Sequence, residues 1–372
     1  MKIKVMTVFG TRPEGIKMAP IIKVMERVPE IENIICVTAQ HRQMLDQVLN
    51  LFNIDPHYDL NIFKPGQTLT EITMRALKGL EEVIKEEQPD ILLVQGDTTT
   101  VFSGALAAFY QKVKVGHVEA GLRSGNLYSP YPEEANRKLT GILTDFHFAP
   151  TITNKNNLLA EGYPEEKIFV TGNTVIDALK YAVKEDYEFH IPLLNKIDFK
   201  NKKVILMTSH RRENIGKPME NIFSAVNDIA LKYEDVEVVF PIHLNPKVRE
   251  IAYRVFEGNN RIHLIEPLDY EPFTNLMARA HLVVTDSGGL QEEAPSLGKP
   301  VLVVREETER PEGIEAGTAK LVGTDYDRIY KEMDLLLSNQ KEYDKMANAV
   351  NPYGDGKASE RIVDIILNHG VK

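Results

Sequence analysis

The fold of this chain is decided by the stretch Leu282-Val283-Val284-Thr285-Asp286-Ser287-Gly288-Gly289-Leu290-Gln291-Glu292-Glu293-Ala294. Its start, Leu282–Thr285, predicts a buried parallel strand, which a Ser-Gly-Gly turn joins to a helix. Two glycines at such a junction let a ligand approach the backbone closely and leave the first helix amides available to an anion. Glu293 falls one turn into the helix, where a carboxylate could accept hydrogen bonds from ribose hydroxyls. The stretch also fits an ordinary strand–turn–helix unit, so its context must decide.

Length and composition limit the classes of protein that this chain can belong to. Its 372 residues exceed what one hydrophobic core usually supports, so two domains are expected. The sequence has 26% charged and 43% hydrophobic residues, as soluble globular proteins do, and a net charge of −10, which argues against a nucleic-acid surface. No apolar run approaches the roughly 20 residues that cross a bilayer, and the N-terminus enters a strand without a signal-peptide cleavage region. We therefore expect a cytoplasmic protein; its single cysteine, Cys36, excludes an internal disulfide.

Short apolar segments alternate with helical patterns along the chain, which predicts an α/β fold with doubly wound parallel sheets. The strands predicted in the first half are Ile3–Phe9, Ile34–Thr38, Ile91–Gln95, Val113–Val118, Phe146–Ala149 and Ile168–Thr171. The helices predicted there are Pro13–Arg27, Gln43–Phe52, Leu69–Glu87, Thr99–Tyr110 and Thr151–Glu161. In the second half we predict strands at Val204–Thr208, Val236–Pro241, Ile262–Ile265, Leu282–Asp286 and Val301–Val304. The charged stretch from Ile176 to Lys203 has no strand pattern and is interpreted as the connection between two domains.

Ligands of open parallel sheets collect beyond the carboxyl ends of the strands, and cations follow the first strand. Arg12 and Lys17 flank a helix start at Pro13, where two cations beside helix amides suit a diphosphate. Solvated surface charges explain these two residues equally well. The segment has neither the Walker A spacing nor the dinucleotide fingerprint, so it predicts no NAD site.

Three carboxylates follow later strands or a later turn of the first half. Asp97 follows the strand ending at Gln95, Glu119 follows the strand ending at Val118, and Glu133 falls in the first turn of a helix that two prolines precede. Alone, Asp97 could be a helix cap and Glu133 a partner of the helix dipole. Together the three predict a set of general acids and bases.

The second half carries basic groups at its predicted strand ends. His210, followed by Arg211, could bind phosphate and exchange protons near neutral pH. His243 follows the next strand, although a single loop histidine is more often a bystander, and Arg310 lies in a charged loop after Val304. No metal-ligand spacing and no serine-nucleophile frame occur, so we predict neither a metal nor another cofactor.

A set of motifs in a fixed order now points to a family. These motifs are Gly-Thr-Arg-Pro-Glu (10–14), Gln-His-Arg-Gln-Met-Leu-Asp (40–46), Gly-Asp-Thr-Thr-Thr (96–100), His-Val-Glu-Ala-Gly-Leu-Arg (117–123), Pro-Tyr-Pro-Glu-Glu-Ala-Asn-Arg (130–137), His-Arg-Arg-Glu-Asn (210–214), Asp-Ser-Gly-Gly-Leu-Gln-Glu-Glu-Ala-Pro (286–295), Thr-Glu-Arg-Pro-Glu (308–312) and Asn-Pro-Tyr-Gly-Asp-Gly (351–356). Over essentially its whole length, the chain resembles the bacterial non-hydrolysing UDP-N-acetylglucosamine 2-epimerases.

The resemblance implies a GT-B fold, in which two Rossmann-like domains face each other across a cleft. The first would comprise residues 1–175, with the C-terminal helix of about 358–372 packed back on it, and the second, residues 176–357, would bind UDP. It also implies reversible C2 epimerisation of UDP-GlcNAc to UDP-ManNAc for cell-envelope polysaccharides, without NAD or metal. The reaction would eliminate UDP, leaving a 2-acetamidoglucal, and add it back. By the same resemblance we expect a homodimer.

The resemblance further implies roles for individual residues. The acid–base and catalytic set would be Asp97, Glu119, Glu133 and His210. The UDP contacts would be Arg12, Lys17, Leu268 (through its backbone), Phe273, Ser287, Gly288, Gly289, Glu293 and Arg310. A second, activating UDP-GlcNAc would bind at Gln40, His41, Gln43, Glu133, Arg211 and His243. The chain has Gly66 where some members carry arginine, so either Lys64 substitutes for it or the activator binds more weakly.

Three alternatives share parts of this pattern. A hydrolysing epimerase would have the same fold but would release UDP and free ManNAc. A GT-B glycosyltransferase would use the same nucleotide site but would need an acceptor, and three carboxylates are more acid–base equipment than glycosyl transfer requires. A nucleotide-sugar sensor would bind without catalysis, and the retention of every catalytic-type residue argues against it.

Overall fold

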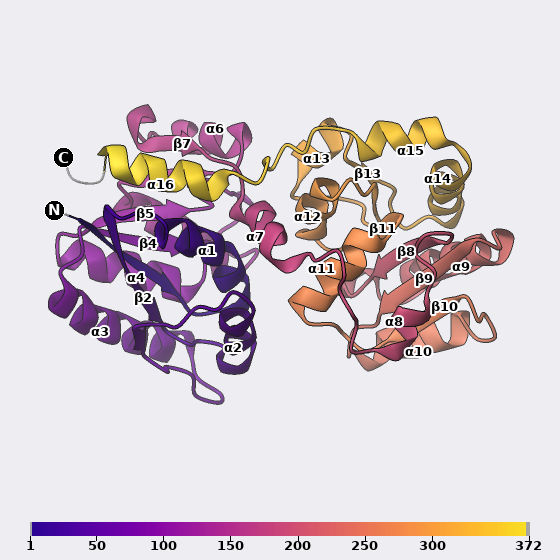
Figure 1. Ribbon diagram of the computed structural model, residues 1–372, viewed down its shortest axis with the longest axis horizontal. Helices are drawn as coiled ribbons and strands as arrows, with labels where there is room; N and C mark the ends of the chain where they lie inside the picture. Colours follow the sequence, from indigo (N-terminus) through magenta and orange to yellow (C-terminus); the bar gives the residue numbers. More distant parts are fainter. Residues whose placement is uncertain (1, 370–372) are drawn as a thin grey trace. The chain divides into compact units, whose positions relative to one another are not determined.

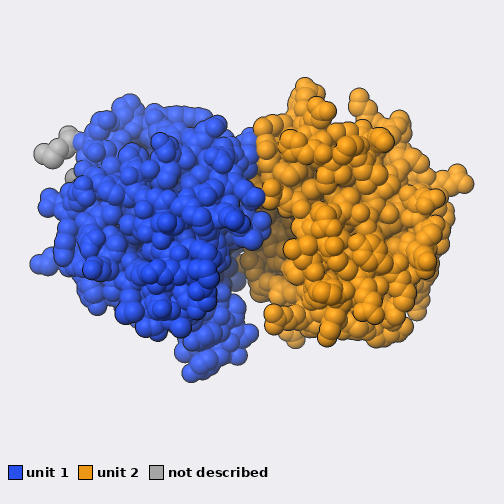
Figure 2. Space-filling model, turned by 90° about the horizontal axis from the view of Figure 1, so that it is seen from below, with its two compact units in different colours: residues 1–181, 353–372 blue, residues 182–352 orange. Residues whose placement is uncertain are grey.

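The structure is a computed structural model that describes residues 2–369, and the chain divides into two compact units (Figure 1 and Figure 2). Unit 1 comprises Met1–Tyr181 with Tyr353–Lys372, and unit 2 comprises Ala182–Pro352. Each unit is built on one parallel sheet with helices between successive strands. The predicted α/β class with two doubly wound parallel sheets, the composition of GT-B folds, is confirmed.

Unit 1 contains a parallel sheet whose strand order is β3-β2-β1-β4-β5-β6-β7 among the described residues. Its strands are β1 (Ile3–Phe9), β2 (Ile31–Val37), β3 (Tyr58–Asp59), β4 (Ile91–Gln95), β5 (Lys114–Val118), β6 (Phe146–Ala149) and β7 (Ile168–Val170). The order reverses between β1 and β4, which pair in parallel. Because β4 and β5 also pair, the strands before Asp97 and Glu119 are neighbours in the sheet.

The helices of unit 1 cover this sheet (Figure 1). They are α1 (Arg12–Met25), α2 (Arg42–Leu51), α3 (Leu69–Glu87), α4 (Thr99–Tyr110), α5 (Glu133–Leu143), α6 (Ile152–Ala160), the 3-10 turn η1 (Glu165–Lys167), α7 (Thr174–Ala182) and α16 (Ala358–His369). Strand β4 is buried along its whole length, as a continuous apolar run in a two-sided parallel sheet should be.

Unit 2 repeats the plan with the strand order β10-β9-β8-β11-β12-β13. Its strands are β8 (Lys203–Thr208), β9 (Val236–Pro241), β10 (Ile262–Ile265), β11 (Leu282–Thr285), β12 (Val301–Val303) and β13 (Ala319–Leu321). Its helices are α8 (Pro192–Lys196), η2 (Arg212–Asn214), α9 (Lys217–Lys232), α10 (Pro246–Val255), α11 (Tyr270–Arg279), α12 (Leu290–Ser296), α13 (Pro311–Glu315), α14 (Tyr326–Ser338) and α15 (Gln340–Ala347). The reversal point lies between β8 and β11.

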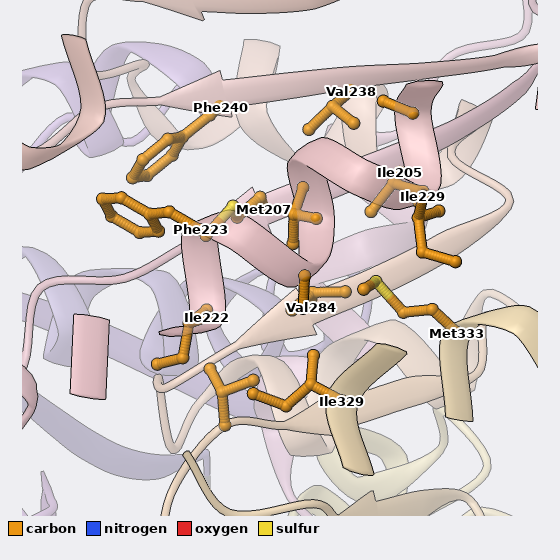
Figure 3. Packing of buried hydrophobic residues seen from close by; sticks show 14 of the residues in the cluster. Ile205, Met207, Ile222, Phe223, Ile229, Val238, Phe240, Val284, Ile329 and Met333 are labelled. Atoms are coloured by element: carbon orange, nitrogen blue, oxygen red, sulfur yellow. The ribbon is translucent and has the colours of Figure 1, made fainter. Parts of the chain in front are cut away.

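The core of unit 2 joins α9 to the sheet (Figure 3). Phe223 of α9 meets Phe240 of β9 edge-to-face, with ring centroids 5.5 Å apart. Both rings are fully buried, and burial of one such side chain stabilises a fold by about 1.5–3 kcal/mol relative to exposure. The core therefore fixes β8 and β9, whose ends carry His210 and His243.

Helix α7 corrects the interpretation of residues 176–203 as a plain connection. Asp177 accepts hydrogen bonds from the backbone N–H groups of Ser359 (2.8 Å) and Ala358 (3.2 Å) at the start of α16. Burial raises the pKa of the Asp177 carboxyl, although these N–H groups oppose the shift. Asp177 thus ties α7 to α16, and the units divide after Tyr181 and Pro352, where the sequence predicted divisions after 175 and 357.

No helix within residues 2–369 is both long enough and apolar enough to span a membrane.

Candidate active site

The strand order of unit 1 gathers the predicted site residues at one edge of its sheet. Gln40 follows β2, Arg12 follows β1, Asp97 follows β4 and Glu119 follows β5, and these strands are consecutive in the sheet. In a parallel sheet, all of these ends lie at the carboxyl edge, which is where ligands bind, especially beside the point at which the order reverses. That point, between β1 and β4, separates Arg12 from Asp97.

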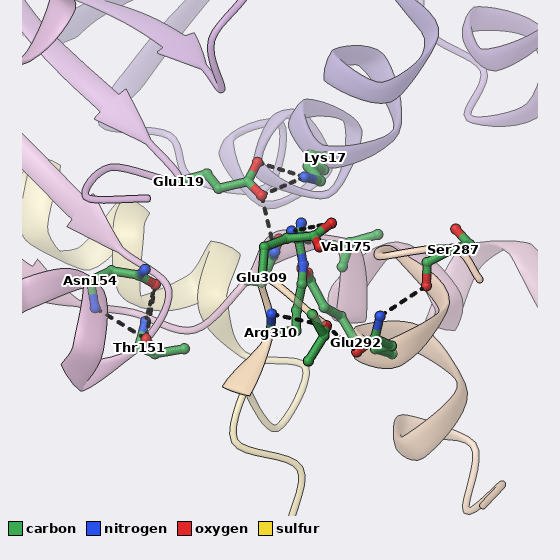
Figure 4. Close-up of polar contacts among 12 residues, drawn as sticks. Lys17, Glu119, Thr151, Asn154, Val175, Ser287, Glu292, Glu309 and Arg310 are labelled. Atoms are coloured by element: carbon green, nitrogen blue, oxygen red, sulfur yellow. Dashed lines mark hydrogen bonds and ion pairs between the residues drawn. The ribbon is translucent and has the colours of Figure 1, made fainter. Parts of the chain in front are cut away.

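Side chains of unit 1 hold Glu119, and Figure 4 shows its contact with Lys17. Lys17 Nζ lies 2.6 Å from Oε1 and 2.5 Å from Oε2, Gln95 donates to Oε2, and Asn173 Nδ2 lies 3.4 Å from Oε1. The Glu119 side chain is only 6% exposed. Its backbone is left-handed, with φ of 65°, a conformation that costs free energy in a non-glycine residue and that clusters at functional sites. Glu119 is thus a buried carboxylate fixed in one orientation.

Asp97 is paired with a cation that sequence reasoning did not single out. Arg137 of α5 donates from Nη2 to Asp97 Oδ2 (2.5 Å) and from Nη1 to Glu134 Oε2 (3.0 Å). Asn136, beside it on α5, donates to the Asp97 carbonyl at 2.9 Å. Arg137 is part of the motif 130–137. Its position one helical turn after Glu133 was the one sequence signal that both side chains reach the carboxyl edge of the sheet.

Two further carboxylates, one predicted and one missed, lie at this edge of unit 1. Glu133 is the first residue of α5, and its buried Oε2 makes no hydrogen bond with any residue in 2–369. Glu14, the missed carboxylate, accepts from the N–H groups of Gly10 and Thr11 (both 2.7 Å) and from the hydroxyl of Thr98. Burial raises the pKa of Glu14 despite these donors. Glu14 thereby joins the loop after β1 to the loop after β4.

Two histidines, His117 and His147, lie within the strands of the first sheet. His117 on β5 lies opposite His147 on β6, and both imidazoles are buried. Burial lowers the pKa of His117 to about 4, although its contact with the Gly96 carbonyl (2.7 Å from Nε2) opposes the shift. Burial also lowers the pKa of His147 to about 3. Both rings are therefore neutral near pH 7.

The second sheet places the predicted residues of unit 2 at consecutive strand ends. His243 follows β9, His210 follows β8, Ser287 follows β11 and Arg310 follows β12. The imidazole of His210 stacks on that of His243, with ring centroids 5.6 Å apart and planes 22° apart. Burial lowers the pKa of His243, and the neighbouring His210 adds to this shift.

Asp286, at the end of β11, organises the loop after β8. Its Oδ2 accepts from the N–H groups of His210 (2.8 Å) and Arg211 (2.9 Å) and from the hydroxyl of Ser209 (3.2 Å). Burial acts to raise the pKa of Asp286, but the contacts with His210 and the backbone N–H groups outweigh it, and the pKa is lowered. Asp286 is thus an ionised, fully buried carboxylate beside His210.

The turn at 287–289 is cross-linked to the loop that carries Arg310. Gln291 donates to the Ser287 carbonyl (3.2 Å) and accepts from Thr308 (2.7 Å), while Arg310 Nε donates to Glu292 Oε1 at 2.7 Å. A Cβ on Gly288 would come within 2.7 Å of a carboxylate oxygen of Glu309, so the Glu309 side chain would have to move to admit a larger residue. The N–H groups of Gly288 and Gly289 precede the first turn of α12, where such groups have no helical acceptor. An anion there would meet backbone amides and the Arg310 guanidinium.

Glu293, Phe273 and Leu268 also belong to unit 2 and are half-buried. Oε1 of Glu293 lies 3.6 Å from where a Cβ on Gly289 would be, so the carboxylate is beside the turn. Burial raises the pKa of Tyr270 well above its ordinary value, and Glu293 adds to this shift. Phe273 lies on α11, and Leu268 lies between β10 and α11.

The residues expected to hold an activator fall into two sets. In unit 1, Gln40 accepts from Thr100 Oγ1 at 3.0 Å, and exposed His41 and Gln43 flank the start of α2. In unit 2, the Arg211 Nη2 lies 3.3 Å from Glu309 Oε1.

Gly66, the departure from the family pattern, is left-handed with φ of 71°, so its backbone suits glycine better than arginine.

Among the residues 2–369, no group of three or more His, Cys, Asp or Glu side chains is placed to hold a metal ion.

Comparison with known proteins decides the family. The sequence model of the UDP-N-acetylglucosamine 2-epimerase family matches residues 23–367. The chain belongs to this family. It is 58% identical to the UDP-N-acetylglucosamine 2-epimerase of Bacillus subtilis strain 168 over 368 residues, 99% of this chain and 96% of that protein.

Two solved members of the family have the same fold. The UDP-GlcNAc 2-epimerase from Neisseria meningitidis, bound to UDP-GlcNAc, has a TM-score of 0.86 and 52% identity, covering 99% of this chain and 100% of that chain. The enzyme from Methanocaldococcus jannaschii has a TM-score of 0.86 and 39% identity, covering 98% of this chain and 100% of that chain. The resemblance in the motifs is therefore confirmed at the level of the family.

Proposed function

We propose that this chain catalyses the reversible C2 epimerisation of UDP-GlcNAc to UDP-ManNAc by the non-hydrolysing route. The observation that carries the proposal is the pair of carboxylates after neighbouring strands, Asp97 and Glu119, each held by its own cation. Membership of the epimerase family supports the same activity. Pathway and assembly stay expectations: supply of UDP-ManNAc for envelope polysaccharides, and a homodimer.

The proposed chemistry needs a base, an acid and a place for the leaving group. A carboxylate of unit 1 removes the proton at C2 while the bond between C1 and the UDP oxygen breaks, which gives 2-acetamidoglucal and UDP. A second acid, from the set of Asp97, Glu119 and Glu133, returns a proton to C2 from the other face, and UDP adds back to C1. Carboxylates at neighbouring strand ends suit two such roles, because each is held in position by a partner of its own.

Unit 2 supplies the nucleotide cradle in this proposal. The amides of Gly288 and Gly289, with Arg310, bind the diphosphate, and Glu293 binds ribose hydroxyls. Phe273 and the backbone of Leu268 are assigned to uracil, following the family resemblance. His210 follows β8, the neighbour of β11 in the sheet, and in this proposal it exchanges a proton with the diphosphate.

A second UDP-GlcNAc is proposed to activate the enzyme. Arg211 and His243 would contribute to its binding in unit 2, and Gln40, His41, Gln43 and Glu133 in unit 1. Because His243 stacks on His210, a ligand held by His243 would alter the surroundings of a proposed catalytic side chain directly. Such a ligand activates by binding one state of the enzyme more tightly than the other.

Proton NMR of UDP-GlcNAc with the protein in deuterium oxide tests the proposal. We expect deuterium at C2 and new signals of a manno-configured UDP-sugar. A known epimerase of the family, used at the same enzyme concentration, is the positive control. If that enzyme converts UDP-GlcNAc while this protein leaves it undeuterated and unchanged, the proposal is refuted.

The hydrolysing alternative predicts a different product balance. If UDP accumulates in step with free ManNAc during chromatography of the reaction, the non-hydrolysing route is wrong. A glycosyltransferase would instead leave UDP-GlcNAc unchanged until an acceptor is added.

A further inference from the structure

The two carboxylate oxygens of Asp286 differ in their hydrogen bonds. Oδ2 accepts from the N–H groups of His210 and Arg211 and from Ser209. Oδ1 is also buried, yet within residues 2–369 it makes no hydrogen bond of good geometry. A buried carboxylate oxygen without a donor is costly, so a neighbouring donor should exist.

That neighbour is the imidazole of His210. Its Nδ1 lies 3.2 Å from Asp286 Oδ1, and the ring is 41% exposed. Loose alignment of this kind is common before a ligand binds. Because the carboxylate is ionised and can only accept, a hydrogen bond between these atoms requires the proton to be on Nδ1. In the neutral ring, Nε2 is then the nitrogen with the free lone pair.

We propose that Asp286 is a positioning residue that fixes His210 as the Nδ1–H tautomer, so that Nε2 is the nitrogen that accepts and returns a proton. The proposal rests on the proposed function for the role of His210. Its geometry is independent of that function, since it depends only on atoms of unit 2. Carboxylates orient catalytic histidines in this way in other enzymes, where loss of the charge leaves the wrong tautomer.

The backbone contacts explain how one side chain does this. Asp286 follows β11 and His210 follows β8, and the two strands pair in parallel, with Thr285 opposite Thr208. The N–H bonds to Oδ2 fix the main chain of the loop at His210 and Arg211, so the imidazole can rotate only about its own side-chain bonds. The stack on His243 limits that rotation further.

The substitution Asp286→Asn distinguishes two roles of Asp286: orienting the His210 imidazole and holding the backbone of the loop. Its amide oxygen can still accept from the two backbone N–H groups, while its NH₂ group replaces Oδ1. An NH₂ group donates to Nδ1 and so favours the opposite tautomer, with the proton on Nε2. We expect kcat to fall by about 10²-fold or more, by analogy with other oriented histidines, while the Kd for UDP changes less than about threefold.

Ser209→Ala is the matched control, because it removes a hydrogen bond to the same carboxylate but leaves Nδ1 of His210 facing it. We expect its turnover to fall by no more than a few-fold. If Ser209→Ala and Asp286→Asn lower turnover equally, the role of Asp286 is architectural and the inference is overturned.

The tautomer itself is read by ¹⁵N NMR of protein labelled at histidine, without substrate and at a pH where the ring is neutral. The His210 signal is assigned by its loss in His210→Asn. We expect the Nδ1–H pattern in the wild type and the Nε2–H pattern in Asp286→Asn. An Nε2–H pattern in the wild type, or an Asp286→Asn enzyme with turnover within threefold of wild type, would overturn the inference. Absence of wild-type epimerase activity would instead refute the proposed function, and the tautomer measurement would still decide the geometry.

Discussion

Lys17 Nζ lies 2.5 Å from Oε2 of Glu119, and the two side chains are 18% and 6% exposed. The pair joins α1 to the end of β5, which are far apart in the sequence. Family resemblance assigned Lys17 to UDP and Glu119 to catalysis, whereas this structure places the ammonium on the carboxylate. In this structure, Lys17 therefore helps to fix the orientation of the Glu119 carboxylate.

Replacement of Lys17 should for this reason impair turnover more than nucleotide binding. A hydrogen bond to a charged group contributes about 1.5–3 kcal/mol, so Lys17→Gln should lower kcat by roughly 10–100-fold. The Kd for UDP, measured by calorimetry, should change less than about threefold. Lys23→Gln is the matched control, since Lys23 lies on the same helix but pairs with Glu26 near the surface. Weak UDP binding with normal kcat would return Lys17 to the role of a nucleotide contact.

The acid–base residues should each be needed for turnover. We expect Asp97→Asn, Glu119→Gln and His210→Asn to lower kcat by roughly 10²–10⁴, or about 3–5 kcal/mol of barrier, with much smaller effects on UDP binding. Glu165→Gln, which loses the partner of Lys155 at a carboxylate that is 70% exposed, should behave like wild type. A variant that keeps more than about a tenth of wild-type kcat would remove that residue from the proposed chemistry.

The strand ends could be predicted from the sequence, because short apolar runs mark buried parallel strands and fix where they stop. Strands such as Ile91–Gln95 and Val236–Pro241 were predicted to the residue. The helices α14 and α15 were missed, as was the two-residue strand β3, whose length carries no periodicity.

Contacts between segments that are far apart in the chain could not be predicted from the sequence. Asp177 reads as one charge in a charged stretch, and only its bonds to the start of α16 show that α7 belongs to unit 1. In the same way, Arg137 and Glu14 read as ordinary helix charges until the fold brings them to Asp97 and Thr98. Asp286 reads as the end of a strand, and its role depends on β8 pairing with β11.

Glu293 should contribute equally to the binding of UDP-GlcNAc and of UDP. Glu293→Ala should weaken UDP and UDP-GlcNAc alike by about 1.5–3 kcal/mol, because a ribose contact is shared by ground and transition states. Calorimetric titration measures both affinities. Glu271→Ala removes the ion pair between Glu271 of α11 and exposed Lys184, and it should leave both affinities unchanged. Unchanged UDP affinity in Glu293→Ala would remove Glu293 from the proposed nucleotide site.

Activation should depend on Arg211. The rate should rise sigmoidally with UDP-GlcNAc, and the reaction from UDP-ManNAc alone should be slow until a little UDP-GlcNAc is added. Arg211→Ala should make the rate curve less sigmoidal, while the affinity for UDP at the Ser287 turn stays nearly unchanged. Arg254→Ala, which loses only an exposed ion pair with Glu220, is the control and should keep the sigmoidal curve. Because Gly66 replaces a cation of some relatives, we expect weak activator binding. Hyperbolic wild-type kinetics with full reverse activity would show that no second site operates.

The buried histidines of the first sheet should make stability depend on pH. In the unfolded chain both imidazoles take up a proton near pH 6.5, whereas in the folded chain the pKa values of His117 and His147 are about 4 and about 3. Between these values the unfolded state binds more protons, so stability is full above pH 6.5 and falls as the pH falls. Each histidine contributes up to about 1.4 kcal/mol per pH unit in that window.

Urea unfolding between pH 7 and pH 5 measures this effect as a fall in the midpoint concentration. His147→Leu should make the fall shallower, because His147 has no hydrogen-bond partner within residues 2–369 and its ring packs on Tyr163, with centroids 4.8 Å apart. A leucine of similar size loses nothing polar there and cannot take up the proton. The exposed His190 provides the control, and His190→Gln should keep the wild-type dependence. An equal fall in wild type and His147→Leu would mean that the carboxylates, and not this buried imidazole, control acid unfolding.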